Sequence, residues 1–199
     1  MLPCIECPAP AKDVFFDGIL ADSMACLPPM KQRFINLRGV LEVMEYYDEI
    51  SEGYDELHRE EQLKKLALIK QYIKPKKTDT LLDIGCGSGL SSDWDCKVVG
   101  LDPSLSLLEK NPKIKVFGSG EQLPFKDKSF DYVVCVTALH NFEDVEKGLK
   151  EIKRVAKGQV VISLLKKSQE FSRIKELIPE YFNIINEIDE VMDVIYIME

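Results

Sequence analysis

The chain has 199 residues, of which 45% are hydrophobic, so it is long enough to bury one core and is best treated as a single domain with an extension. Its 34 acidic residues exceed its 26 basic residues, and the formal net charge of −8 makes the chain alone a poor binder of polyanions. A nucleic-acid substrate would therefore need a basic partner or a local basic patch to contact its phosphates.

We expect a cytoplasmic protein with no membrane segment. No run of residues approaches the length of a transmembrane helix, and the N-terminus lacks the basic and apolar pattern of a secretory signal. Six cysteines occur without the spacing of a disulfide framework, which favours a reducing compartment. They are Cys4, Cys7, Cys26, Cys86, Cys96 and Cys135.

The first part of the chain differs in composition from the rest. We expect an N-terminal extension of uncertain structure over residues 1–43, because prolines interrupt any long element there, and one domain over residues 44–199. An alternative interpretation is that the extension is an upstream reading-frame extension and that translation starts at Met44.

A zinc site in this extension is considered and not expected. Cys4 and Cys7 have the spacing of half a zinc site, and Cys26 is a third candidate ligand. No fourth ligand with suitable spacing follows, so the pattern favours unpaired thiols, and we expect no metal site.

A helix is predicted from Tyr54 to Ile73, ahead of the first strand. Apolar residues recur along it at every third or fourth position: Leu63, Leu66, Ile69 and Ile73. Three lysines are predicted to lie outside this apolar stripe: Lys64, Lys65 and Lys70. The pattern indicates a helix that covers one face of a sheet.

Strands and helices then alternate along the chain. Strands are predicted at Thr80 to Ile84, Lys97 to Leu101, Ile114 to Phe117, Tyr132 to Val136 and Gln159 to Leu164. Helices are predicted at Ser104 to Lys110, Glu143 to Lys157 and Ser168 to Ile178. This alternation favours an α/β fold with a doubly wound, mostly parallel sheet. Two last strands, Tyr181 to Ile188 and Val191 to Met198, are predicted to form a C-terminal antiparallel hairpin.

Glycines at every second position follow the first predicted strand. The stretch Asp83-Ile84-Gly85-Cys86-Gly87-Ser88-Gly89 is typical of a turn to which a ligand comes close, because glycine has no Cβ and tolerates positive φ. Asp102 ends the next strand, at the same edge of a parallel sheet, where a carboxylate can accept hydrogen bonds from both ribose hydroxyls. Asp83 is placed to hold an ammonium group directly or through water. A purely structural turn, with Asp102 capping the helix after Pro103, is the alternative.

Two ligands suit this turn. NAD sites have the spacing G-x-G-x-x-G, whereas this chain has G-x-G-x-G. The D-x-G-x-G-x-G pattern from Asp83 resembles motif I of the class I S-adenosylmethionine-dependent methyltransferases. The segment from Glu121 to Val134 resembles the LPF…SFD signature of the methyltransferase type 11 (UbiE-like) group, and residues 137–144 stand where its members carry an LHH…D segment. The resemblance covers about Tyr46 to Leu165.

The resemblance implies a Rossmann-like methyltransferase sheet, S-adenosylmethionine as cofactor and a role for each matching residue. Gly85, Cys86 and Gly87 would wrap the amino-acid end of the cofactor. Asp102 would hold the ribose and Pro103 would border the adenine. The adenine edge would be lined by Gly120 and Glu121. Ser119 departs from the pattern, because relatives carry an Asp there that accepts a hydrogen bond from the adenine amino group.

Tyrosines ahead of the first long helix resemble the "Y-D" helix that closes over the cofactor in these enzymes. Tyr47 and Tyr54 are the residues we assign to cofactor contact, because an aromatic face attracts a sulfonium and excludes water. Ordinary packing of these tyrosines between helix and sheet is the alternative.

His140 is the candidate catalytic residue, since it follows the fourth predicted strand and can accept a proton from the acceptor. The alternative is that it orders the loop or contacts the cofactor's carboxylate. Asn141 is predicted to cap the next helix, with Asp144 three residues further on.

The stretch between Gly89 and Lys97 is unusually short and leaves room for only a short helix, on which Trp94 is predicted as a packing residue. This shortening and the sequence LLDIGCGSGLS resemble those of rRNA guanine and wobble-uridine tRNA methyltransferases, which work with a small zinc-ribbon activator. The resemblance therefore implies an activator of that kind as a possible partner.

Together these patterns favour a methyltransferase that transfers a methyl group from S-adenosylmethionine to RNA or to a small molecule. The alternative from another class is a non-catalytic S-adenosylmethionine-binding scaffold subunit of a partner complex, and an NAD oxidoreductase is a weaker one.

Overall fold

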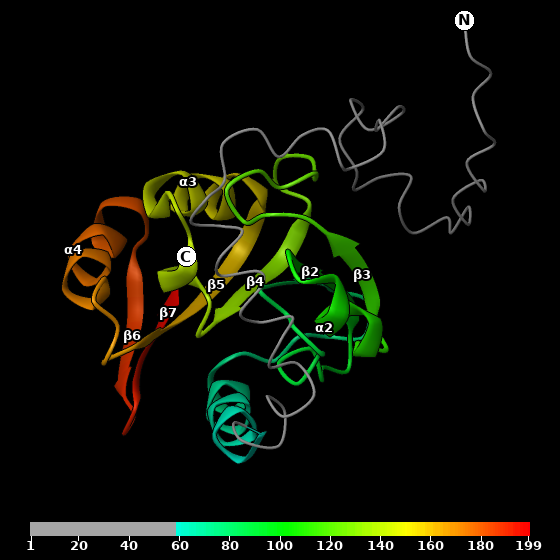
Figure 1. Ribbon diagram of the computed structural model, residues 1–199, viewed down its shortest axis with the longest axis horizontal. Coiled ribbons are helices and arrows are strands. Elements are labelled where there is room, and N and C mark those ends of the chain that lie inside the picture. Colours follow the sequence, from blue (N-terminus) through cyan, green and yellow to red (C-terminus); the bar gives the residue numbers. More distant parts are fainter. Residues whose placement is uncertain (1–58) are drawn as a thin grey trace, which may run out of the picture.

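The computed structural model describes residues 59–199, which form one seven-stranded sheet with helices on both faces (Figure 1). The strand order is β3-β2-β1-β4-β5-β7-β6. The strands are β1 (Thr80–Ile84), β2 (Lys97–Asp102), β3 (Ile114–Phe117), β4 (Phe130–Val136), β5 (Ala156–Leu165), β6 (Ile184–Asp189) and β7 (Asp193–Met198). The helices are one over residues 59–72, α2 (Leu105–Lys110), the 3-10 helix η3 (Leu139–Asn141), α3 (Val145–Val155) and α4 (Phe171–Tyr181).

The predicted fold class is confirmed. Strands β3, β2, β1, β4 and β5 pair in parallel, and β7 pairs antiparallel with both β5 and β6. The chain order reverses direction across the sheet between β1 and β4, which is the switch point where doubly wound sheets bind ligands beyond their strand ends.

Alternate residues of each central strand belong to two separate cores. On one face, Leu82 and Val133 pack with α3 and α4. On the other face, Leu81 and Val134 pack with the helix over residues 59–72. Burial on both faces explains why these strands are continuous apolar runs in the sequence. Figure 1 draws α3 and the helix over residues 59–72 on opposite sides of the sheet.

Some predicted boundaries are wrong by a few residues. The helix predicted to reach Lys157 ends at Val155, because Ala156 pairs with Phe130 and begins β5 directly. The helix predicted from Ser168 begins at Phe171 and continues to Tyr181. Pairing with neighbouring strands decides where a helix stops, and local propensity does not report that pairing.

The first described helix exposes and buries different residues from those predicted. Leu63, assigned to the apolar stripe, is 41% exposed, whereas Lys65, assigned to the polar face, is completely buried. Leu66, Ile69 and Ile73 are buried as predicted. Lys65 can be buried because its ammonium contacts oxygen atoms of Glu61, of Thr137 after β4 and of Asp193 at the start of β7.

No helix forms between the glycine turn and β2 in the described chain, so the predicted short helix is wrong. Residues 85–96 form turns, bends and irregular backbone. Trp94 is buried there against Val98 and the first helix, as a packing residue should be. Its indole Nε1 donates to the carbonyl of Ser91 at 2.8 Å, which holds the turn without helical hydrogen bonds.

Several predictions lie outside the described residues: the extension over residues 1–43, the thiols of Cys4, Cys7 and Cys26, and both Tyr47 and Tyr54. Over residues 59–199, no helix has the length and apolar character needed to cross a membrane.

Candidate functional site

A pocket opens beyond the carboxyl ends of β1, β2 and β4. Its lining contains seven of the residues that the sequence analysis assigned to the cofactor: Gly85, Cys86, Gly87, Asp102, Pro103, Gly120 and Glu121. The loop after β4 supplies the opposite wall through Thr137 and Ala138. The pocket therefore brings together segments from Gln62 to Phe142 that are far apart in the chain, at the edge where a doubly wound sheet binds ligands.

The glycine turn has the backbone that its sequence predicts. Gly85 and Gly87 have φ values of 71° and 50°, in the left-handed region that side chains disfavour. A Cβ on Gly85 would lie 2.3 Å from the Cβ of Ala138. Glycine is required at this position because the turn approaches the loop after β4 too closely for any side chain.

Asn111 supports the turn from below, a role that the sequence analysis missed. Its buried amide nitrogen Nδ2 lies 3.4 Å from Sγ of Cys86 and 3.5 Å from the carbonyl oxygen of Gly87. Burial raises the pKa of the Cys86 thiol, so Cys86 stays protonated and serves as a packing group. A buried amide touching the turn identifies Asn111 as a supporting residue, but its position after α2 carries no recognisable motif.

Asp102 connects the turn to α2. One carboxylate oxygen, Oδ2, accepts the backbone N–H of Gly87 at 2.8 Å, and Oδ1 accepts the backbone N–H of Ser104 at 2.8 Å. Ser104 is itself the N-cap of α2. The alternative in which Asp102 caps this helix is wrong, because the hydroxyl of Ser104 accepts the backbone N–H of Leu107. The Asp102 side chain lines the pocket.

Asp83 is turned toward the segment that follows the glycines. It is fully buried, accepts from the hydroxyl of Ser91 at 2.8 Å and from that of Ser92, and is not among the residues lining the pocket. Burial raises the pKa of Asp83 to about 6, against the lowering effect of the two serine hydroxyls. Its contacts show a carboxyl that fixes the loop; contact with an ammonium group stays a prediction.

The far end of the pocket contains an aromatic ring that the sequence analysis did not assign. Phe142 lines the pocket, and a Cβ on Gly120 would lie 2.1 Å from its ring, and one on Gly148 2.4 Å. The ring fits between the two glycines. The two glycines are compatible with a bulky neighbour, but the sequence around them does not identify Phe142 as that neighbour.

Glu121 is held from two sides. Its Oε1 accepts the backbone N–H of Glu143 at 2.9 Å, and its Oε2 receives a hydrogen bond from the hydroxyl of Ser119. The serine that departs from the family pattern therefore orients the neighbouring glutamate at the pocket wall.

His140 lies in η3, between Leu139 and Asn141, and is not itself among the residues lining the pocket. Its Nδ1 is buried and has no hydrogen-bond partner among the described residues. Burial lowers the pKa of His140, and the nearby Lys65 lowers it further while Asp193 opposes the shift. The imidazole is therefore neutral at pH 7, and its catalytic role stays a prediction.

Asn141 does not cap α3, so that prediction is wrong. The N-cap is Asp144, whose Oδ1 accepts the backbone N–H of Lys147 at 3.0 Å. Asn141 instead ends η3 and lines the pocket, because the 3-10 turn delays the start of α3 by three residues.

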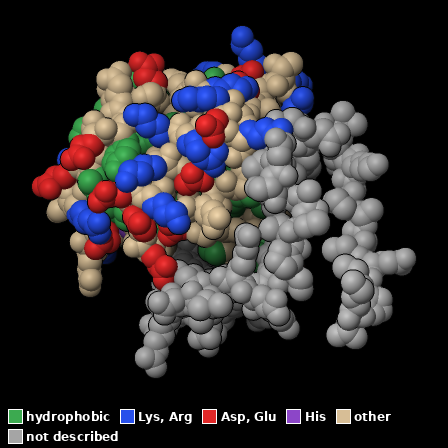
Figure 2. Space-filling view, turned by 90° about the horizontal axis from the view of Figure 1, so that it is seen from above, with side chains coloured by type: hydrophobic (Ala, Val, Ile, Leu, Met, Phe, Trp, Pro, Cys, Tyr) green, Lys and Arg blue, Asp and Glu red, His purple; other side chains and the backbone are tan. Residues whose placement is uncertain are grey.

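The surface shows no large field of one charge on the face drawn in Figure 2, where Lys and Arg side chains are interspersed with Asp and Glu. Three exposed lysines follow one another along α3, namely Lys147, Lys150 and Lys153. A single row of this kind on a chain of net charge −8 offers limited attraction for a polyanion.

The comparisons with known proteins point to one family. The sequence profile described as "Methyltransferase domain" matches residues 82–163. The demethylmenaquinone methyltransferase of Lysinibacillus sphaericus is 30% identical over 173 residues, which cover 72% of this chain and 70% of that protein. The uncharacterized protein MJ1252 of Methanocaldococcus jannaschii is 34% identical over 126 residues, which cover 60% of this chain. The match spans only 49% of MJ1252, and another spans 58% of MJ0638 from the same archaeon.

A solved structure shares the fold. It is that of a Haloferax volcanii methyltransferase in complex with the Trm112 methyltransferase activator, and it superposes with a TM-score of 0.66 at 16% sequence identity. The superposition covers 78% of this chain and 96% of that one, so nearly the whole of the solved chain has its counterpart here.

Proposed function

This chain belongs to the class I S-adenosylmethionine-dependent methyltransferases, and from that premise we propose that it binds S-adenosylmethionine in the pocket beyond β1, β2 and β4 and transfers its methyl group to an acceptor. The observation that carries the proposal is the combination of a left-handed glycine turn and the Asp102 carboxylate on one pocket wall. Such a turn lets the backbone approach a ligand, and the carboxylate suits a ribose.

The residues present fit the cofactor. The backbone of the turn at Gly85 to Gly87 lines the pocket, where it would face the amino-acid end. Asp102 would accept the ribose hydroxyls, and Pro103 and Phe142 present apolar surface to the adenine. The sulfonium cofactor supplies an electrophilic methyl group and leaves as a neutral thioether.

The protein's chemical task is therefore alignment and exclusion of water, since a neutral leaving group needs no proton donor. An acceptor that attacks through an N–H or O–H group must lose its proton. His140, which is neutral and lies in the chain between the lining residues Ala138 and Asn141, is our candidate to receive it.

Calorimetric titration tests the cofactor assignment. We expect S-adenosylhomocysteine to bind with a stoichiometry of one and NAD to give no heat and no rise in melting temperature. Binding of NAD in preference to S-adenosylhomocysteine would overturn the proposal.

We propose RNA or a small molecule as the acceptor, and the two are separated by experiment. The relative from Lysinibacillus sphaericus is named for a small-molecule substrate, demethylmenaquinone. Incubation with tritiated S-adenosylmethionine and cell extract, followed by separation of RNA, protein and small molecules, identifies the labelled class. If no fraction acquires label while the cofactor binds, the chain is instead a cofactor-binding scaffold subunit.

A small zinc-ribbon activator is the partner we propose. The Haloferax volcanii protein of the same fold is in complex with the Trm112 activator. In this chain β3 is an edge strand of the described sheet and leads into Ser119, Gly120 and Glu121 at the pocket, so a protein covering that edge would lie beside the cofactor. Purification under low salt from the cytoplasmic fraction of the native cell is expected to yield a one-to-one complex with the activator. Recovery of the monomer alone would count against this partner.

A further inference from the structure

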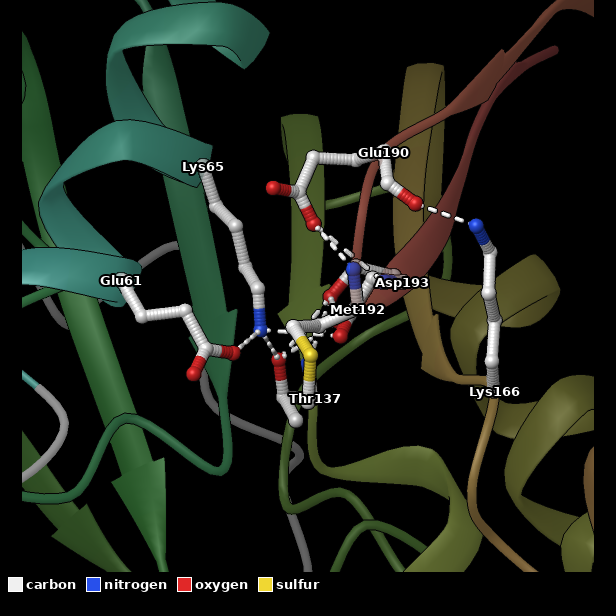
Figure 3. Close-up of polar contacts among 8 residues, drawn as sticks. Glu61, Lys65, Thr137, Lys166, Glu190, Met192 and Asp193 are labelled. Carbon is white, nitrogen blue, oxygen red and sulfur yellow. Dashed lines mark hydrogen bonds and ion pairs between the residues drawn. The ribbon is translucent and has the colours of Figure 1, made fainter.

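A completely buried lysine contacts Thr137, a residue of the pocket wall. Lys65 lies in the helix over residues 59–72, and its ammonium Nζ reaches the carboxylate of Glu61 at 2.6 Å, Oδ1 of Asp193 at 2.9 Å and Oγ1 of Thr137 at 3.1 Å (Figure 3). An ammonium has three protons to donate, and here two carboxylates and one hydroxyl lie within 3.1 Å of it. A buried lysine requires such partners, because burial of an unpaired charge is very costly.

Thr137 is the point at which these contacts meet. Its hydroxyl lies 2.9 Å from Oδ2 of Asp193, and the same oxygen accepts the hydroxyl of Ser163 at 2.9 Å. The backbone N–H of Thr137 donates to Oγ of Ser163 at 2.8 Å. Helix, β5, β7 and the loop after β4 are therefore joined through one threonine.

Asp193 is itself anchored at the start of β7. The carboxylate of Glu190 accepts the backbone N–H groups of Met192 and Asp193, at 2.9 Å and 3.3 Å, and the Lys166 ammonium donates to the backbone carbonyl of Glu190. Figure 3 shows these contacts converging on the turn that precedes β7. The Asp193 carboxylate, which pairs with the Lys65 ammonium, thus has a fixed position relative to the sheet.

The backbone of Thr137 is strained. Its φ is 54°, in the left-handed region, which a β-branched residue rarely adopts. Such a conformation persists only where the surroundings hold it in place, and here both the side chain and the N–H of Thr137 are held. The strained residue lies on the pocket wall, and the next residue, Ala138, is the one that meets Gly85.

We propose that Lys65 is a positioning residue for the cofactor site: with Asp193 it holds Thr137 in the left-handed conformation that places the Thr137–Ala138 wall against the glycine turn. The inference rests on the proposed binding of S-adenosylmethionine in this pocket. It adds a residue that no motif indicates and that acts through Thr137, without contact with the reacting atoms.

The strain gives a test that distinguishes positioning from simple contact. Thr137→Val keeps the shape and the β-branch but removes the hydroxyl that is held, whereas Thr137→Gly removes more atoms but adopts positive φ without strain. We expect Thr137→Val to bind S-adenosylhomocysteine about tenfold more weakly than the parent and Thr137→Gly to bind within about threefold of it. If contact alone mattered, the glycine variant would be the weaker one.

A second pair of variants tests Lys65 directly. Lys65→Met with Asp193→Asn removes the two fully buried charges together and keeps the volume. The remaining carboxylate, that of Glu61, is 33% exposed and can be solvated. We expect about tenfold weaker binding of S-adenosylhomocysteine, and recovery of most of that loss when Thr137→Gly is added. Lys64→Met, at an exposed neighbouring lysine, is the matched control and should bind like the parent.

Melting temperatures are measured for every variant so that affinities are compared only between folded proteins. Valine at position 137 binding as well as glycine, or no recovery on adding Thr137→Gly to the charge-pair variant, overturns the inference. The Thr137 pair decides the question even if the charge-pair variant does not fold. Failure of the parent itself to bind S-adenosylhomocysteine would instead overturn the proposed function.

Discussion

The two walls of the pocket are held by different kinds of interaction. The wall formed by the glycine turn depends on close-range contacts, such as Asp102 with Gly87, fifteen residues apart. The wall after β4 depends on Lys65, which is 72 residues from Thr137 in the chain, and on Asp193, 56 residues beyond it. The first wall therefore uses glycine backbone and short loops, and the second uses buried charges from distant elements.

This difference has an energetic consequence. A turn built from glycines tolerates a ligand close to its backbone but has few side chains to hold it, so neighbouring loops must support it. A wall held by a buried ion pair is rigid, yet the loss of either charge leaves the other without a partner. The two walls should fail differently when substituted.

The largest effect is expected from Lys65→Ala. Removing the ammonium leaves Asp193 buried without its partner, so we expect the free energy of unfolding to fall by about 3–5 kcal/mol. Urea denaturation followed by circular dichroism measures it. Lys64→Ala, which removes an exposed lysine from the same helix, should leave stability almost unchanged. Equal losses for the two variants would show that the distant wall does not depend on the buried pair.

The next largest effect is expected from Gly85→Ala, a loss of cofactor affinity, because this variant disturbs the contact between the two pocket walls. The added Cβ would lie 2.3 Å from Ala138 at a φ of 71°, so both overlap and strain weaken the site. We expect more than about 100-fold weaker binding of S-adenosylhomocysteine by calorimetry. Gly87→Ala is the comparison, because its nearest side-chain atom, Cδ1 of Leu107, would be 3.7 Å away. We expect it to cost only about fivefold, and equal losses would refute the steric argument.

Asp102→Ala tests the wall formed by the glycine turn and leaves the wall after β4 unchanged. The backbone N–H groups of Gly87 and Ser104 lose their acceptor, and the proposed ribose contact is lost with them. We expect cofactor affinity to fall by about 50-fold, while the Lys65 network and most of the stability remain. Unchanged binding of S-adenosylhomocysteine would remove Asp102 from the cofactor site.

The smallest effect is a pH dependence carried by Asp83. Its pKa in the folded protein is about 6, above the ordinary value of 3.8, so the folded state binds this proton more tightly. The resulting stability is fully present below about pH 3.8 and is lost as the pH rises through about 6. Asp83→Asn should remove on the order of 1 kcal/mol from the difference in unfolding free energy between pH 5 and pH 7. A difference equal to that of the parent would mean that Asp83 titrates normally.

The sequence predicted well the wall formed by the glycine turn. The glycine spacing and Asp102 predicted a ligand at the ends of β1 and β2, and the resemblance to the methyltransferases implied the further lining residues Pro103, Gly120 and Glu121. The absence of a helix around Trp94 was missed, since a tryptophan indole bond to Ser91 and the Asp83 contacts stabilise turns that propensity does not indicate.

The distant wall was not predictable in the same way. From the sequence, a lysine on an amphipathic helix is predicted to face solvent. Only Thr137, Asp193 and Glu61 together make burial of Lys65 favourable. Phe142 was likewise missed because its partners, Gly120 and Gly148, lie on either side of it in the chain and meet only in the fold.

What the amino-acid sequence determined by itself is the alternation of strands and helices, the parallel sheet and the turn from Gly85 to Gly89. These depend on periodicity and on backbone freedom, which act between near neighbours. Tertiary structure alone decided that Lys65 is buried, that Thr137 is strained and that Ala138 meets Gly85. The reason is physical: the free energy of a buried charge or a strained residue depends on atoms brought from distant parts of the chain.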